Sequence, residues 1–364
     1  MKKMISLTTM TPTSLIGHTR EALRQLMVEL GQPAYRGDQL FTWLYHHGVE
    51  GFLEISNLPL ALREQLAERF TLRTLTLARR EISRDGTEKF LWQLPDGHFI
   101  ESVLIPEERR TTVCISSQVG CALGCDFCAT ARMGFLRNLT TGEIVEQILQ
   151  IRRLAAQYQI TNIVFMGMGE PFLNYPRVIQ ACQILGDPEG GAIARKKLTI
   201  STVGIVPRIR QFTRERQPYG LAISLHAPEQ ELRAQLMPVA HRFSLEELLE
   251  SAYEYTRSWK RKRITFEYVL LKGLNHHPEH ARQLIRILSP IRCKLNLIPC
   301  NENDLGYRSP SEEEIEAFVH RLRHAPFTVT VRRNRGQDIS AACGQLYARQ
   351  QAGKMRTLQK ETAQ

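Results

Sequence analysis

The feature that most constrains the fold is a regular alternation of strand-like and helix-like segments that begins at Thr111. Helical periodicity fills the gaps between the strands, for example over residues 142–158, 245–259 and 312–324. Seven strands separated by six helices predict right-handed βαβ units and a parallel sheet. We therefore expect an α/β fold, an incomplete (βα)6 TIM-like barrel, with the chemistry at the C-terminal ends of its strands. The candidate strands span residues 111–117, 161–167, 197–202, 219–225, 264–271, 293–298 and 327–332.

The residues before Thr111 follow a different pattern. Amphipathic segments at 19–27, 35–44 and 60–70 predict a small helical domain over residues 1–85. Strand-like runs at 89–94 and 99–105 flank a Pro-Asp-Gly turn and predict a β-hairpin in a linker over residues 86–110. The barrel is expected over residues 111–346 and a frayed polar tail over 347–364.

The composition of the chain predicts its cellular location and the state of its cysteines. No stretch approaches the roughly 20 apolar residues that a membrane helix needs, and the N-terminus has no apolar block of signal-peptide type. We therefore expect a cytoplasmic protein with no membrane partner. In that compartment the eight cysteines are expected to be thiols, metal ligands or redox catalysts rather than structural disulfides.

The charge balance favours a polyanionic partner. The chain has 48 Lys+Arg against 37 Asp+Glu, a net charge of +11. Such an excess gives sequence-independent affinity for phosphates, although short basic runs are also typical of solvated surface. The balance does not distinguish RNA from DNA. The runs are Arg152-Arg153, Arg195-Lys196-Lys197, Lys260-Arg261-Lys262-Arg263 and Arg332-Arg333-Asn334-Arg335.

Three cysteines, Cys121, Cys125 and Cys128, follow the first predicted barrel strand. A structural zinc site would need a fourth protein ligand, for which Cys114 or a distant residue is a candidate. Three cysteines on a [4Fe–4S] cluster would instead leave one iron open for a small molecule. The pattern C-x3-C-x-aromatic-C, with Phe127 as the aromatic residue, resembles the radical S-adenosylmethionine (radical SAM) superfamily. That resemblance implies a cluster that cleaves S-adenosylmethionine to a 5′-deoxyadenosyl radical.

A second motif lies at the end of the next predicted strand. Glycines there let a ligand approach the backbone, and a carboxylate can pair with an ammonium group. Alone, the pattern Met166 to Pro171 is typical of a turn. After an iron–sulfur loop it resembles the superfamily motif that holds the methionine amino group, with Gly169 and Glu170 as the binding residues.

Over residues 20 to 350 the chain is similar to the RlmN/Cfr family of RNA methyltransferases, whose RNA-binding accessory domain the N-terminal helices also resemble. The segments that carry the resemblance are Cys114 to Cys121, Arg137 to Thr140, Gly167 to Pro171, Ile200 to Gly204, Ser224 to Pro228, Asn296 to Pro299 and Asp338 to Leu346.

The resemblance implies covalent catalysis by two further cysteines. Cys343 matches the position that first receives the methyl group, and Cys114 the one that later forms a transient disulfide with it. The two are 229 residues apart in the chain, yet the predicted topology brings the first strand and the segment after the last strand together. Glu101 matches the residue that, in the family, is proposed to accept a proton from the adenine ring of the substrate. The alternation of residues in the hairpin also allows Glu101 to face solvent. Two molecules of S-adenosylmethionine are consumed per turnover.

Further positions match the family's S-adenosylmethionine contacts and fall at or just beyond predicted strand ends, as barrel logic requires. These are Ser201, Ser224, Leu225, His226 and Asn301. A histidine after an apolar strand is often a satisfied core residue, so His226 depends on the resemblance. Cys182, Cys293 and Cys300 match no family motif and are expected to be small buried hydrophobes.

The implied substrate is an adenosine of 23S rRNA, methylated at C2, with a tRNA adenosine beside the anticodon as a second target and a flavodoxin-like electron donor. We expect a monomer. The alternative within the family is Cfr-type methylation at C8, because the Leu346-Tyr347 pair resembles the sequence of Cfr-type enzymes. Outside the family, a non-catalytic RNA-binding protein with a zinc knuckle and a radical SAM enzyme with a small-molecule substrate remain open.

Overall fold

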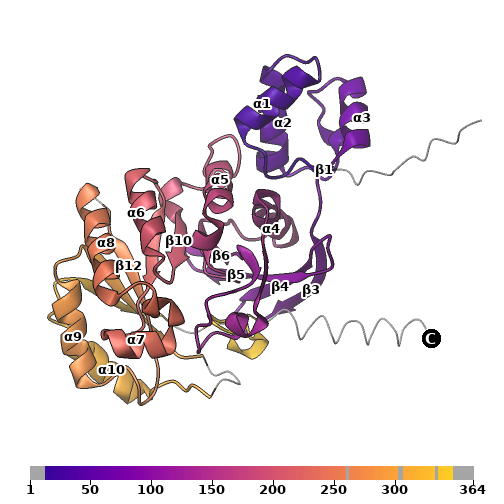
Figure 1. The fold of residues 1–364 in the computed structure, drawn as a ribbon. Helices are drawn as coiled ribbons and strands as arrows, with labels where there is room; N and C mark the ends of the chain where they lie inside the picture. The colour runs from indigo at the N-terminus through magenta and orange to yellow at the C-terminus, as the bar shows by residue number, and fades with distance from the viewer. Residues whose placement is uncertain (1–12, 260–261, 302–305, 333–334, 347–364) are drawn as a thin grey trace, which may run out of the picture.

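The computed structural model describes residues 13–259, 262–301, 306–332 and 335–346. Parts of two basic runs, Lys260-Arg261 and Arg333-Asn334, and the predicted tail at 347–364 lie outside the described residues. Figure 1 shows a helical N-terminal lobe above an α/β body, with antiparallel strands extending one edge of the main sheet. Within the described part of the chain, no helix is long and apolar enough to cross a membrane.

The N-terminal lobe contains the three predicted helices, α1 (Arg20–Glu29), α2 (Tyr35–Thr42) and α3 (Leu60–Arg69). The Thr19 hydroxyl caps α1 by accepting a hydrogen bond from the Ala22 amide at 3.2 Å. Two short parallel strands, β1 (Thr13–Ser14) and β2 (Phe70–Thr71), join the two ends of the lobe. The core of the lobe consists of Leu23, Met27, Leu40, Phe41, Leu44, Leu62 and Leu66.

The main sheet has ten strands in the order β14-β13-β12-β11-β10-β9-β6-β5-β4-β3. From β6 to β14 every neighbouring pair is parallel, whereas β3, β4 and β5 add to the edge of β6 as an antiparallel meander. The strands are β3 (Thr76–Ile82), β4 (Glu88–Gln93), β5 (Phe99–Glu107), β6 (Arg110–Cys114), β9 (Asn162–Phe165), β10 (Leu198–Thr202), β11 (Gly220–Ser224), β12 (Ile264–Leu270), β13 (Cys293–Pro299) and β14 (Thr328–Val331).

Helices connect successive parallel strands, which confirms the incomplete (βα)6 barrel. Among the described residues β14 pairs only with β13, so the sheet stays open. The predicted hairpin is present as β4 and β5. A third strand, β3, pairs with β4 and lies within residues 1–85, the range expected for the helical domain. The domain boundaries themselves stay predictions. The barrel helices are α4 (Thr141–Leu154), α5 (Tyr175–Leu185), α6 (Val206–Arg214), α7 (Gln230–Leu236), α8 (Leu245–Ser258), α9 (Pro278–Leu288) and α10 (Glu312–Arg321).

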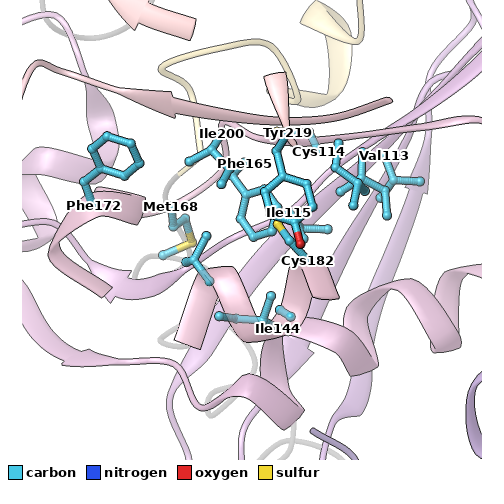
Figure 2. Close-up of a cluster of buried hydrophobic side chains, with 14 of the residues drawn as sticks. Val113, Cys114, Ile115, Ile144, Phe165, Met168, Phe172, Cys182, Ile200 and Tyr219 are labelled. Carbon is cyan, nitrogen blue, oxygen red and sulfur yellow. The ribbon is translucent and has the colours of Figure 1, made fainter. Parts of the chain in front are cut away.

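Apolar side chains fill the space between the first barrel strands and the helices that cover them (Figure 2). Val113 of β6 and Ile115 just beyond its end lie in this cluster with Phe165 of β9 and Ile144 of α4. Cys182 of α5 is fully buried there, as expected for a small hydrophobe. This packing holds the C-terminal ends of β6 and β9 in place.

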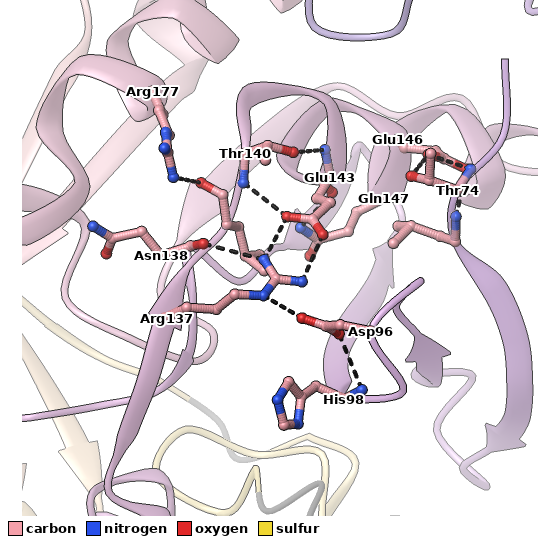
Figure 3. Close-up of polar contacts among 12 residues, drawn as sticks. Thr74, Asp96, His98, Arg137, Asn138, Thr140, Glu143, Glu146, Gln147 and Arg177 are labelled. Carbon is pink, nitrogen blue, oxygen red and sulfur yellow. Dashed lines mark hydrogen bonds and ion pairs between the residues drawn. The ribbon is translucent and has the colours of Figure 1, made fainter. Parts of the chain in front are cut away.

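Helix α4 also anchors two segments through polar contacts (Figure 3). The Glu146 carboxylate accepts hydrogen bonds from the Thr74 and Leu75 amides at 2.9 Å, which ties the exit of the lobe to the barrel. Arg137 forms a two-armed pair with Glu143, at 2.9 and 2.8 Å, and also pairs with Asp96. The hairpin turn and the segment after the cysteine loop are therefore fixed to one helix.

The basic run at the end of α4 joins the lobe to the barrel. Arg152 donates to the Tyr45 carbonyl at 3.2 Å, and Arg153 pairs with Glu50. Nearby, Arg20 of α1 pairs with Asp187 at 2.6 Å. Arg152 and Arg153 thus hold the two parts of the protein together, a role that charge counting did not distinguish from phosphate binding.

Candidate active site

The loop that carries the three cysteines lies beyond the C-terminal end of β6, as predicted. It is bounded by the short strands β7 (Gln118–Gly120) and β8 (Phe135–Asn138), which pair with each other. The Asp126 amide donates to the Leu236 carbonyl at 3.0 Å, which fixes the middle of the loop to the end of α7. Gly120 has φ +74°, and a Cβ there would lie 1.8 Å from the Gly134 oxygen, so only glycine allows this closure.

A single cavity at the C-terminal ends of the strands collects most of the predicted site residues. Cys114, Glu101 and Leu225 do not line this cavity. Cys300, expected to be a simple core residue, does line it, whereas Cys293 is buried as expected. The predicted residues that line it are Cys121, Cys125, Cys128, Gly169, Glu170, Ser201, Ser224, His226, Asn301 and Cys343.

The three loop cysteines are electrostatically coupled. Burial, with contributions from Glu170 and Cys128, raises the pKa of Cys121 to about 12, and burial together with Cys128 and Cys121 raises that of Cys125. Buried thiols that oppose one another's ionisation are a donor set for a cationic centre. A closed structural zinc site takes four protein ligands, whereas three cysteines that line one cavity fit an iron–sulfur cluster with one iron left open.

Glu170 presents a buried carboxylate at the end of the β9 segment. Its two oxygens accept hydrogen bonds from the Phe172 and Val203 amides, each at 2.9 Å. Burial raises the pKa of Glu170 to about 7 despite these bonds. The group is oriented by the backbone, and among the described residues no Lys or Arg side chain forms an ion pair with it, which suits it to an incoming ammonium group.

His226 combines the two roles considered for it. Its Nδ1 accepts a hydrogen bond from the Val269 amide at 3.1 Å, which assigns the proton of a neutral ring to Nε2. Burial and the nearby Arg233 lower the pKa of His226 to about 3, so the ring is neutral. Phe127 of the cysteine loop packs edge-on against it, with ring centroids 4.9 Å apart. A satisfied buried histidine can therefore still line the cavity.

Glu101 and Cys114 lie on adjacent antiparallel strands behind the cavity. Cys114 pairs with Val103 in the register, so Glu101 projects from the same face of the sheet two residues away. Glu101 is only 1% exposed, and its carboxylate lies 3.7 Å from the Lys89 ammonium. The solvent-facing alternative for Glu101 is therefore wrong.

The segment that carries Cys343 is held from three sides. Asn301 donates to the Cys343 carbonyl at 3.2 Å, and the Thr130 hydroxyl beyond the cysteine loop donates to the Leu346 carbonyl at 2.8 Å. On the other side, the Asp338 carboxylate accepts from the Ser83 hydroxyl at 2.6 Å. The β3–β4 turn thus forms one wall of the Cys343 segment.

Four charged residues near the site escaped the sequence reasoning. Glu267 lines the cavity from β12, and Arg233 is buried and donates to the Val203 carbonyl at 2.6 Å. A charged residue within an otherwise apolar parallel strand, such as Glu267, could have been recognised. Lys89 and Arg332 gave no such signal in the sequence. Arg332 has the pattern of a surface basic run.

Comparisons with known proteins agree with this geometry. Residues 115–285 match the radical SAM superfamily, and residues 13–72 match the ribosomal RNA large subunit methyltransferase N-terminal domain. A dual-specificity RNA methyltransferase RlmN from Syntrophobacter fumaroxidans is 46% identical, covering 93% of this chain and 99% of the relative. Its counterpart from Alcanivorax borkumensis is 40% identical over 93% and 91%.

A solved structure gives the same result. The crystal structure of a radical SAM methyltransferase from Sphaerobacter thermophilus superposes with a TM-score of 0.88 at 43% identity, covering 93% of this chain and all of that one. Fold, cysteine loop and cavity together define a radical SAM enzyme, which uses a [4Fe–4S] cluster and S-adenosylmethionine. Within that class, the chain belongs to the RlmN family of RNA methyltransferases.

Proposed function

We propose that the protein methylates C2 of an adenosine in 23S rRNA, and the adenosine beside the anticodon in tRNA, through a methyl group carried on Cys343. The observation that most supports this proposal is that Cys343 lines the same cavity as Cys121, Cys125 and Cys128. Cys114 lies close enough to Cys343 for the charge of the Cys343 thiolate to raise the pKa of Cys114, an effect that adds to that of burial. The relatives' name, dual-specificity RNA methyltransferase, supports two RNA substrates.

The protein's own residues have separate tasks in this proposal. Cys121, Cys125 and Cys128 hold the cluster, while Gly169 and Glu170 receive the methionine end of S-adenosylmethionine. Ser201, Ser224, His226 and Asn301 line the rest of its site, with Leu225 as a buried support. Together, the bound cluster and S-adenosylmethionine supply a radical that activates the methyl group on Cys343. Glu101 accepts the proton of the adenine ring. Cys114 then attacks the Cys343 sulfur, so that an S–S bond forms while the bond from this sulfur to the transferred carbon breaks and its electron pair leaves with the methylated product.

Product analysis tests the substrate and the position. Anaerobically reconstituted protein is incubated with a 23S rRNA fragment or a tRNA, a reductant and methyl-deuterated S-adenosylmethionine, and the digested RNA is examined by mass spectrometry. The proposal predicts 2-methyladenosine that has lost one methyl deuterium. A product of 8-methyladenosine would move the protein to the Cfr-type reaction, and cofactor cleavage without methylated adenosine would remove the RNA substrate. A flavodoxin-like protein is the proposed electron donor, and the monomer the proposed state.

A further inference from the structure

Arg332 contacts the sulfur atom of Cys343. It follows β14 directly, and its amide donates to the Leu297 carbonyl at 2.8 Å, which continues the pairing with β13. From this strand position its guanidinium Nη1 donates a hydrogen bond to Cys343 Sγ at 3.1 Å. The contact thus joins a rigid element to the thiol proposed to carry the methyl group.

The environment of the guanidinium is built from acidic groups. Cys343, Glu267 and Cys114 together raise the pKa of Arg332, although burial opposes this. Glu267 is itself oriented, because Asn296 donates to its carboxylate at 2.7 Å and Thr330 donates to the Asn296 oxygen at 3.0 Å. A permanently charged group therefore lies among both thiols of the site and one carboxylate.

The sulfur is held against Arg332 by its own segment. The Ala341 amide donates to the Gly336 carbonyl at 2.8 Å, and the Gly336 amide donates to Asp85 of the β3–β4 turn at 3.0 Å. Asn301 fixes the Cys343 carbonyl on the cavity side. The backbone segments of both partners in the Arg332–Cys343 contact are therefore held in place by hydrogen bonds.

We propose that Arg332 binds Cys343 Sγ as a thiolate and orients it for methyl transfer, which makes it a further functional residue of the reaction. This inference rests on the proposed function of Cys343. In the loading step the Cys343 thiolate attacks the methyl carbon of the sulfonium, and a new S–C bond forms. The old C–S bond breaks, and its electron pair remains on the sulfur of S-adenosylhomocysteine.

The same contact explains which of the two thiols takes the methyl group. Burial raises the pKa of Cys114 to about 12, and the nearby Cys343 adds to this effect. During loading, Cys114 is therefore a neutral thiol and the poorer nucleophile, and it must lose its proton before it attacks Cys343 in the later release step, whereas Cys343 has a guanidinium donor on its sulfur. After loading, Sγ becomes a neutral thioether and a weak acceptor, which leaves the guanidinium to interact with Glu267.

The test measures Cys343 reactivity in the full-length, cluster-reconstituted protein without S-adenosylmethionine. Brief exposure to iodoacetamide over a range of pH is followed by peptide mass spectrometry of Cys343. We expect Arg332→Gln to need a pH at least about one unit higher for half-maximal rate, and so to react about tenfold more slowly at neutral pH. Arg332→Lys should recover part of the loss. Arg335→Gln, which removes a neighbouring charge that donates to the Asp85 carbonyl, should follow the unmodified protein.

The alkaline plateau separates charge from structure. Equal plateau rates with a shifted midpoint support the proposal, because the thiolate is then equally accessible in both proteins. An unchanged midpoint in Arg332→Gln would overturn it, whatever the plateau does. Loading by trideuteromethyl S-adenosylmethionine gives the second readout, and Arg332→Gln should load about tenfold more slowly at neutral pH. If the unmodified protein never loads, the function proposed for Cys343 fails while the alkylation profile still decides the role of Arg332.

Discussion

The Ala129 amide donates a hydrogen bond to the Gly344 carbonyl at 2.8 Å. Ala129 follows the last cysteine of the cluster loop, and Gly344 follows the cysteine proposed to carry the methyl group. Segments more than two hundred residues apart are thereby joined backbone to backbone. The geometry of methyl activation thus depends on the closing segment of the barrel as much as on the loop that holds the cluster.

The clearest chemical prediction concerns Cys114. Cys114→Ala should accept the methyl group on Cys343 and add it to RNA, but it cannot form the disulfide that releases the product. A covalent protein–RNA adduct should accumulate and be visible on a denaturing gel. Cys293→Ala, which removes a buried thiol at the start of β13, serves as the control and should turn over without adduct. Normal product release by Cys114→Ala would exclude the two-cysteine scheme.

Glu170 should make cofactor binding depend on pH. Because the pKa of Glu170 is raised to about 7, the carboxyl becomes neutral as the pH falls below this value and can no longer pair with the methionine ammonium. Affinity for S-adenosylmethionine should therefore weaken as pH is lowered through about 7. Glu170→Gln should bind weakly at every pH, and parallel profiles of the two proteins in equilibrium binding would contradict the assignment.

The Lys89–Glu101 pair should be important for stability. Lys89 is 3% exposed, and Lys89→Met removes the positive charge that faces the buried Glu101 carboxylate. We expect a loss of about 3–5 kcal/mol in the free energy of unfolding, measured by denaturant titration. The double variant Lys89→Met/Glu101→Gln should recover part of this loss. Strictly additive effects would show that the two side chains do not interact.

Gly169 should tolerate no side chain. Its φ is +95°, and a Cβ would lie 2.5 Å from the Gln118 Cβ. Gly169→Ala therefore combines backbone strain with a clash and should destabilise the protein by more than the roughly 1–3 kcal/mol of strain alone. Gly273→Ala is the matched control, because Gly273 has φ +76° with open space around it. Equal losses in thermal or denaturant unfolding would mean that the clash is relieved elsewhere.

The sequence predicted the barrel well because strands buried on both faces read as apolar runs, such as residues 221–223 in β11. Local patterns did not show that β5 is covered on both faces, since alternating residues are typical of a strand with one solvent face, and Glu101 remained ambiguous for that reason. Arg332 was assigned to a basic run because its partner, Cys343, meets it only in the folded chain. Long-range contacts of this kind have no local signal.

The account depends most directly on the methyl group that Cys343 carries. The decisive measurement is peptide mass spectrometry of the reconstituted protein after incubation with trideuteromethyl S-adenosylmethionine, followed by a chase with RNA. The account predicts a trideuteromethyl group on Cys343 that disappears during the chase as deuterated methyladenosine forms. Methylated RNA produced while Cys343 remains unlabelled would contradict it.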